Sequence, residues 1–198
     1  MILDNRIKVN LDISTRCPLE CPSCSRQVLY KNKGLTIPGQ DMTLKIFEKI
    51  INHYKKINFC GQISDPIHHP KFIDFLQLLK EKNKICTIHT ASSYKPLSWY
   101  IKAFKANPNA NWIFGIDGLP EESHKHRINQ NGVKLFKVML EARKYLNVKP
   151  IWQYIPFDYN KDNINEIKKI ANREGLILKE LVARKDLSTG GYIEHFKT

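Results

Sequence analysis

Residues 11–26 read LDISTRCPLECPSCSR, and this stretch decides the fold that we expect for the chain. Its three cysteines, Cys17, Cys21 and Cys24, follow a C-x3-C-x2-C pattern. The segment 7–13 (IKVNLDI) alternates and is rich in β-branched residues, so it predicts a first strand. Two prolines keep the cysteine segment irregular. The pattern therefore predicts three thiols on one loop at the end of a strand.

Two kinds of metal centre are compatible with three closely spaced cysteines. Three thiolates on a short loop can bind three irons of a 4Fe-4S cluster and leave the fourth iron open to another ligand. A structural zinc site is the alternative, with Cys60, Cys86 or one of the histidines as the fourth ligand. The spacing alone leaves both open.

Downstream of this loop, strand-like and helix-like segments alternate. The periodicity predicts further strands at 57–60, 85–90, 112–116, 151–155 and 176–182, helices at 42–55, 70–82, 96–105, 133–146 and 162–174, and a loop at 27–40. Such alternation predicts a parallel sheet covered by helices. The carboxyl ends of parallel strands are where folds of this kind place their chemistry.

Composition limits the class of protein. At 198 residues the chain predicts one domain, which we place at 1–183 with a tail at 184–198. We find no apolar run long enough to span a membrane and no signal-peptide pattern, so we expect a cytoplasmic protein. Five cysteines are an odd number, which argues against a disulfide framework.

The net charge of +13 favours an acidic partner, such as nucleic acid, a nucleotide or an acidic peptide. The lysines are spread along the chain and are not gathered in one arm. The charge is therefore only a weak indication of a nucleic-acid partner.

Cysteines with this spacing after a first strand resemble the signature of the radical S-adenosylmethionine (SAM) superfamily. The resemblance implies an α/β fold, a partial (β/α)6 TIM-type barrel with a parallel sheet and outer helices. It also implies a 4Fe-4S cluster held by Cys17, Cys21 and Cys24, with SAM on the open iron. An electron from a donor such as flavodoxin or ferredoxin would then cleave SAM, and the resulting 5′-deoxyadenosyl radical would abstract hydrogen from a substrate.

Segments after the second and third strands also resemble this superfamily. Ser64, Asp65 and Pro66 match the end of its Gly-Gly-Glu-Pro segment, with Asp in place of Glu. The resemblance implies that Asp65 accepts hydrogen bonds from the SAM ammonium. The segment 89–93 (HTASS) is similar to a Thr-Asn-Gly segment, which implies that Thr90 lines the SAM pocket.

After the fourth strand, residues 115–120 (GIDGLP) resemble a Ser-Ile-Asp-Gly segment that precedes a His and an Arg. The resemblance implies that Asp117 shapes this loop and that Arg127 binds the carboxylate of SAM or of a substrate. Gly115 stands where the family often has Ser, which departs from the pattern.

The segment 152–157 (WQYIPF) resembles one branch of the superfamily, whose longer members carry a C-terminal twitch or SPASM-type extension. The chain is similar to the core domain of that branch, without the extension. Strand alternation places Gln153 toward the pocket. Ser23 stands where most members have an aromatic residue near the SAM adenine, so we expect Ile155 to supply an apolar contact instead.

Two histidines and two cysteines remain to be interpreted. His124 and His126 can handle a substrate proton near neutral pH or can form a solvated pair. Cys60 and Cys86 lie in predicted strands, and we expect both to be buried in the core.

The sequence therefore predicts a radical SAM enzyme whose substrate is a peptide or protein. Radical SAM modification of a nucleotide or RNA is one alternative, suggested by the charge. A basic zinc or iron–sulfur binding module without turnover is another. No catalytic residue beyond the cofactor contacts is assigned.

Overall fold

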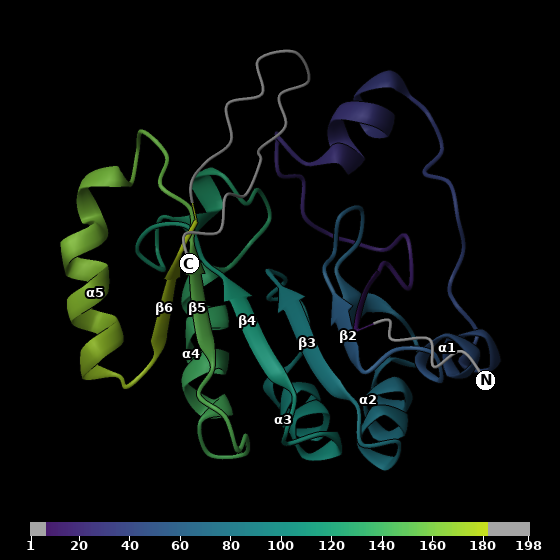
Figure 1. Ribbon diagram of the computed structural model, residues 1–198. Coiled ribbons are helices and arrows are strands. Elements are labelled where there is room, and N and C mark those ends of the chain that lie inside the picture. The colour runs from purple at the N-terminus through teal and green to yellow at the C-terminus, as the bar shows by residue number, and fades with distance from the viewer. Residues whose placement is uncertain (1–6, 182–198) are drawn as a thin grey trace.

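The computed structural model describes residues 7–181, which contain one six-stranded sheet (Figure 1). Its strands are parallel and lie in sequence order. They are β1 (Lys8–Leu11), β2 (Lys56–Phe59), β3 (Ile85–Thr90), β4 (Asn111–Gly115), β5 (Ile151–Tyr154) and β6 (Ile177–Glu180). Within the described residues β1 and β6 do not pair, so the sheet is open. The predicted partial (β/α)6 barrel is confirmed.

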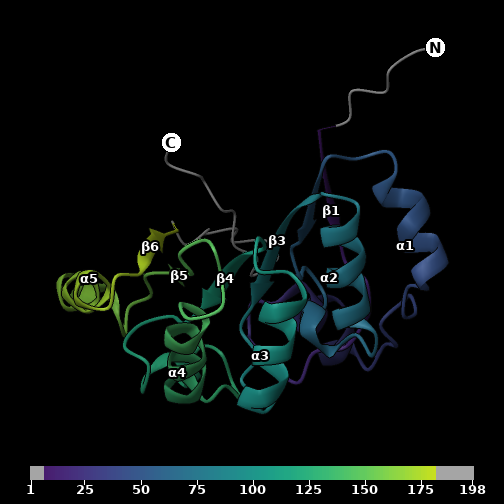
Figure 2. The ribbon, with the colours of Figure 1, turned by 90° about the horizontal axis from the view of Figure 1, so that it is seen from below.

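Helices connect successive strands and cover the outer side of the curved sheet, as Figure 2 shows from below. They are α1 (Leu44–Ile51), α2 (Phe72–Glu81), α3 (Leu97–Ala106), α4 (Gly132–Ala142) and α5 (Ile164–Arg173). The hydroxyl of Thr43 caps α1 by accepting a hydrogen bond from the Ile46 amide at 3.3 Å. The predicted helices are confirmed, with ends that differ by a few residues.

The predicted loop at 27–40 is wrong in its first part. Arg26–Tyr30 form a π-helical turn (η1), and Lys31–Lys33 form a 3-10 turn (η2). The Cys24 carbonyl starts the first turn, because it accepts hydrogen bonds from the amides of Gln27 and Val28. These turns are too short to show an apolar period in the sequence. The predicted end of the sixth strand and the tail at 184–198 lie outside the described residues.

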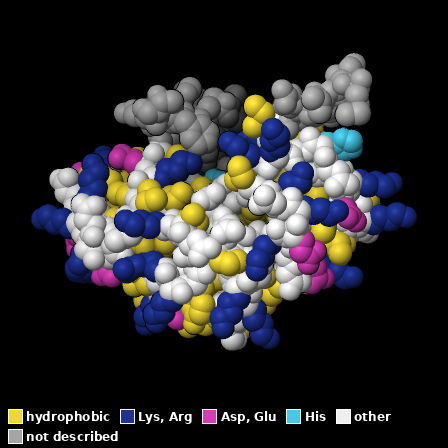
Figure 3. Space-filling view, turned by 60° about the horizontal axis from the view of Figure 1, so that its bottom comes forward, with side chains coloured by type: hydrophobic (Ala, Val, Ile, Leu, Met, Phe, Trp, Pro, Cys, Tyr) yellow, Lys and Arg dark blue, Asp and Glu magenta, His cyan; other side chains and the backbone are white. Residues whose placement is uncertain are grey.

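The surface is basic over much of its area. Figure 3 shows Lys and Arg side chains spread over the visible face, without a single dominant cluster. The described part of the chain contains no helix with the length and hydropathy that crossing a membrane requires.

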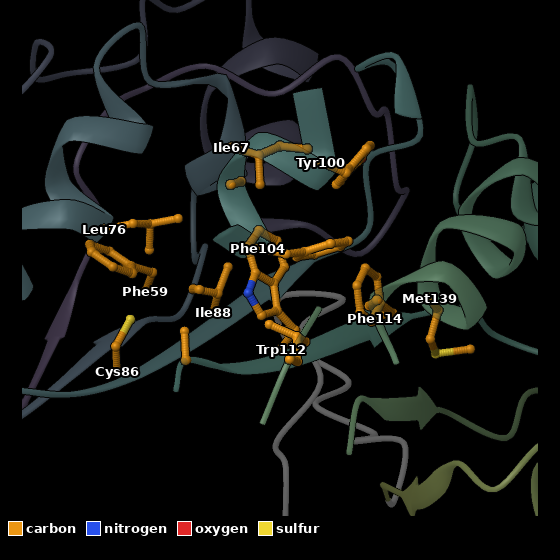
Figure 4. Packing of buried hydrophobic residues seen from close by; sticks show 14 of the residues in the cluster. Phe59, Ile67, Leu76, Cys86, Ile88, Tyr100, Phe104, Trp112, Phe114 and Met139 are labelled. Carbon is orange, nitrogen blue, oxygen red and sulfur yellow. The ribbon is translucent and has the colours of Figure 1, made fainter. Parts of the chain in front are cut away.

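The core lies between the sheet and its helices. Alternate residues of the strands point outward and pack there, among them Phe59, Cys86 and Phe114 (Figure 4). Trp112 lies at the centre, with its ring edge-to-face against Phe104 at a centroid distance of 5.0 Å. The prediction that Cys86 belongs to the core is confirmed.

The opposite, concave face of the sheet is polar. Asn10, Asn58 and Thr87 lie side by side in the strand register, and the amide of Asn58 donates to Asn10 at 2.9 Å. A closed (β/α)8 barrel fills this space with layers of branched apolar side chains. Here the polar face leaves room at the carboxyl ends of the strands for a ligand site.

Substitutions of Trp112 test how much the core contributes to the free energy of unfolding. The Trp112→Ala change removes a fully buried indole, so we expect the free energy of unfolding to fall by ~3–5 kcal/mol in urea titrations. Among the described residues the indole Nε1–H has no acceptor, so Trp112→Phe removes an unpaired donor and should cost less than ~1.5 kcal/mol. Equal losses in the two variants would contradict this packing.

Candidate cofactor site

A cavity of about 400 Å³ opens at the carboxyl ends of the strands. It brings together residues that are far apart in the sequence: the three loop cysteines with Ser64, Asp65, Thr90, Arg127 and Gln153. Every predicted cofactor or metal residue except Asp117 therefore lines one cavity. Ser23 and Ile155, the two residues expected near an adenine, line it as well.

The cysteine loop is held by hydrogen bonds to neighbouring loops. The Glu20 amide donates to the Ile128 carbonyl at 3.2 Å, and the Asn129 side chain donates to the Pro18 carbonyl at 3.3 Å. The guanidinium of Arg26 donates to the carbonyl of Thr15 and, more weakly, to a carbonyl of the loop after β2. These contacts fix the loop over the strand ends.

Burial raises the pKa of two loop thiols, those of Cys17 and Cys21, and so favours their protonated form. It raises the pKa of Cys17 to about 12, with a further contribution from the Asp65 carboxylate. Burial also raises the pKa of Cys21, and the positive charge of Arg127 opposes that shift. A metal would bind the thiolate form, so its binding would displace these protons. The positive charge of Arg127 favours the thiolate form of Cys21.

The two kinds of metal centre place different demands on three cysteines. Zinc needs its thiolates at ~2.3 Å from one point. A 4Fe-4S cluster binds each thiolate at a different iron, so its ligands stand further apart. In the described part of the chain, no group of three or more His, Cys, Asp and Glu side chains is placed to hold a single metal ion. The three loop cysteines line one cavity.

Asp65 is only 4% exposed, and its carboxylate connects the loop after β2 with the end of β3. It accepts hydrogen bonds from the Thr90 hydroxyl at 2.9 and 3.0 Å and from the amides of Ala91 and Ser92 at 2.9 Å each. A fourth donor is the Ile67 amide at 3.4 Å. Asp65 thus holds Thr90 at the cavity wall, and its contact with a SAM ammonium stays a prediction.

Asp12, at the end of β1, is a site residue that sequence reasoning missed. Its carboxylate accepts hydrogen bonds from the Ser64 hydroxyl at 2.9 Å and from the Gln62 amide at 3.2 Å. It therefore orders the loop that carries Ser64 and Asp65. Asp12 falls inside the predicted strand 7–13, and only the observed end of β1 at Leu11 places it at a strand end.

Asp117 and Arg127 form a buried ion pair, with 2.8 Å between Oδ2 and Nε. Asp117 is fully buried behind the cavity wall, and its Oδ1 accepts the Ile155 amide at 3.0 Å. It therefore positions Arg127 and the exit of β5. A Cβ on Gly115 would lie 2.8 Å from Arg127 Nη2, so glycine makes room for the guanidinium where the family often has Ser.

The histidines fall into two groups. His126 lines the cavity and stacks on Phe157 at a centroid distance of 4.0 Å, and burial lowers its pKa to about 4. His89 also lines the cavity, and burial lowers its pKa to about 4. Both are neutral at pH 7. His124 is exposed and lies outside the cavity lining, as expected for a solvated residue.

Cys60 and Gln153 add two polar groups to the cavity. The prediction that Cys60 belongs to the core is wrong, because it follows β2 in register with the concave face and lines the cavity. Gln153 is 7% exposed, and its Oε1 is shielded from solvent within the described residues. A hydrogen bond between the Gln153 and His89 side chains opposes the lowering of the His89 pKa by burial. The two side chains therefore form one polar part of the cavity wall.

The Asp117 and Arg127 pair generates a prediction about stability. Asp117→Asn leaves a guanidinium buried without its counter-charge, so we expect the free energy of unfolding to fall by ~3–5 kcal/mol. Asp41→Asn makes the same chemical change at the exposed Arg16 pair and should cost less than ~1 kcal/mol. Urea titration of both variants checks this, and equal losses would refute the structural role of Asp117.

Known structures share this fold. Structures of SuiB from Streptococcus suis, with and without the precursor peptide SuiA, match 97% of this chain and 43% of SuiB at a TM-score of 0.75 and 11% identity. The structure of SuiB bound to S-adenosylmethionine matches 97% of this chain and 44% of SuiB, at a TM-score of 0.70 and 9% identity. The structure of methylornithine synthase PylB matches 89% of this chain and 53% of PylB, at a TM-score of 0.64 and 11% identity.

No protein-family model and no curated protein matches the sequence significantly. The chain spans only about half of the length of the solved structures that it resembles. At these identities the likeness concerns the fold, and both SuiB and PylB are radical SAM enzymes. The chain has the fold of the radical SAM enzymes.

Proposed function

We propose that this chain is a radical SAM enzyme that binds a 4Fe-4S cluster and S-adenosylmethionine. The observation that carries the proposal is the cavity, in which the three loop cysteines meet the polar residues of the strand ends. When bound and reduced, these cofactors supply a 5′-deoxyadenosyl radical that abstracts hydrogen from a substrate. The chain's own residues bind, orient and enclose the reacting groups.

The cluster would be held by Cys17, Cys21 and Cys24. Arg127 faces the loop with a permanent positive charge, which offsets the negative charge of the thiolates. The loop is fixed by its hydrogen bonds to residues 128–129, so the three ligands are preorganised. The remaining iron would be open toward the cavity.

SAM would occupy the cavity beside the cluster. Its carboxylate would bind Arg127, and its ammonium would bind near Asp65. The hydroxyls of Ser64 and Thr90 and the side chain of Gln153 line the cavity and offer further polar contacts.

Ile155 and Leu19 offer the apolar wall that an adenine needs, in place of the aromatic residue that the family has at Ser23. The neutral imidazole of His126 lies at the same wall.

A peptide or protein is the substrate class that we favour. The structure of SuiB bound to its precursor peptide SuiA supports this class, and this chain matches 43% of SuiB. A nucleotide or RNA substrate rests on the charge of +13, and the spread of cations in Figure 3 offers no single track for a phosphate backbone. An external electron donor such as flavodoxin or ferredoxin would reduce the cluster.

Cysteine variants test the proposal directly. We expect the anaerobically reconstituted protein to bind about four irons per chain and to form 5′-deoxyadenosine from SAM after reduction. Cys21→Ser removes a proposed ligand and should lose most of the iron and all of this product. Cys86→Ala changes a buried core cysteine and should keep both.

Iron analysis and mass spectrometry of the product decide the outcome. Stoichiometric zinc in place of iron would contradict the proposal and favour a binding module without turnover. A cluster that survives Cys21→Ser would also contradict it.

A further inference from the structure

A second hollow, which we call the outer groove, lies beside the cofactor cavity. Its volume is about 820 Å³, and Cys17 lines both hollows. Most of its residues belong to the connection between β1 and α1, the purple and blue segment of Figure 1. The groove is lined by Thr15, Arg16, Cys17, Pro18, Arg26, Gln40, Asp41, His68 and Lys95.

The outer groove is positively charged. Arg16, Arg26 and Lys95 line it, whereas Asp41 is the only carboxylate that residues 7–181 contribute to its lining. Both Nε and Nη2 of Arg16 bind that carboxylate, at 2.7 Å for Nη2, so Asp41 neutralises one cation and leaves two. The Lys95 ammonium lies 5.2 Å from the Trp99 ring centroid, which holds it at the groove wall.

The groove and the cavity share a wall. The Arg26 guanidinium donates to the carbonyls of Thr15 and Ile63, which line the groove and the cavity respectively. On the other side, the His68 ring contacts the Ser92 hydroxyl at 2.7 Å, and the Ser92 amide donates to Asp65. The groove and the cavity therefore meet at Cys17.

We propose that the outer groove binds an acidic segment of the peptide substrate, next to the residue that reacts in the cavity. The inference rests on the proposed function and adds a substrate class, a peptide with aspartate or glutamate beside its modified residue. Lys95 and Arg26, the two cations that Asp41 leaves without a counter-charge, would bind the carboxylates, and the polar side chains of Thr15 and Gln40 would contact the peptide backbone.

The probe is a fluorescein-labelled peptide of alternating glycine and glutamate, compared with the same peptide carrying glutamine. We expect Lys95→Glu to weaken binding of the glutamate peptide by roughly five- to tenfold in fluorescence anisotropy at low salt, and Lys95→Gln to weaken it less. Lys102→Glu makes the same change of net charge on an exposed position of α3 outside the groove. It should change the affinity by less than about twofold.

A variant with tighter binding provides the sharper test. Asp41→Asn removes the carboxylate that the described residues contribute to the groove lining and releases Arg16 from its ion pair. We expect the glutamate peptide to bind about threefold more tightly, and the glutamine peptide to be unaffected. Misfolding cannot produce such a gain.

Several results would overturn the inference. Equal losses in Lys95→Glu and Lys102→Glu would show an effect of overall charge only, and equal binding of the two peptides would exclude carboxylate recognition. Slower reduction by flavodoxin in Lys95→Glu, with unchanged peptide binding, would assign the groove to the electron donor. Iron content and 5′-deoxyadenosine formation by Lys95→Glu, measured with dithionite as reductant, report separately on the proposed function.

Discussion

The buried ion pair between Asp117 and Arg127 joins the sheet to the cysteine loop. Asp117 accepts the Ile155 amide at the exit of β5, and Arg127 lies over Gly115 at the exit of β4. The residues that follow Arg127 bind the backbone of the cysteine loop. A buried charge without its partner is costly, so the pair fixes how the strand ends and the cysteine loop face each other across the cavity. The positive charge of the same guanidinium opposes the rise in the Cys21 pKa that burial causes.

Strand alternation explains why much of this arrangement was predictable from the sequence. Apolar residues on one face of each strand specify the helix-covered core, and the other face carries the polar residues that line the cavity. Cys60 and Cys86 show the limit, because both lie at strands and only the register places one at the cavity and the other in the core. The π-helical turn after Cys24 depends on carbonyl geometry, which leaves no period in the sequence.

Carboxylates were harder to assign than thiols. The cysteines have few structural uses at this spacing, so their convergence on one cavity could be predicted. An aspartate at a strand end can face a ligand, hold a loop or pair with an arginine, and the sequence does not distinguish these roles. Asp117 pairs with Arg127, Asp65 binds Thr90 and two backbone amides, and Asp12 orders the loop after β2. Asp12 and Asp117 thus support the cavity from behind its lining, whereas Asp65 and Gln153 belong to the lining itself.

Electron paramagnetic resonance of the reconstituted and reduced protein, recorded with and without SAM, shows whether the cavity binds SAM at an iron–sulfur cluster. We expect a 4Fe-4S signal whose shape changes when SAM is added, because SAM would bind the iron that the three cysteines leave open. A cluster signal that is indifferent to SAM would contradict the assignment of the cavity as a SAM site. It would leave an iron–sulfur protein whose strand-end residues serve another purpose.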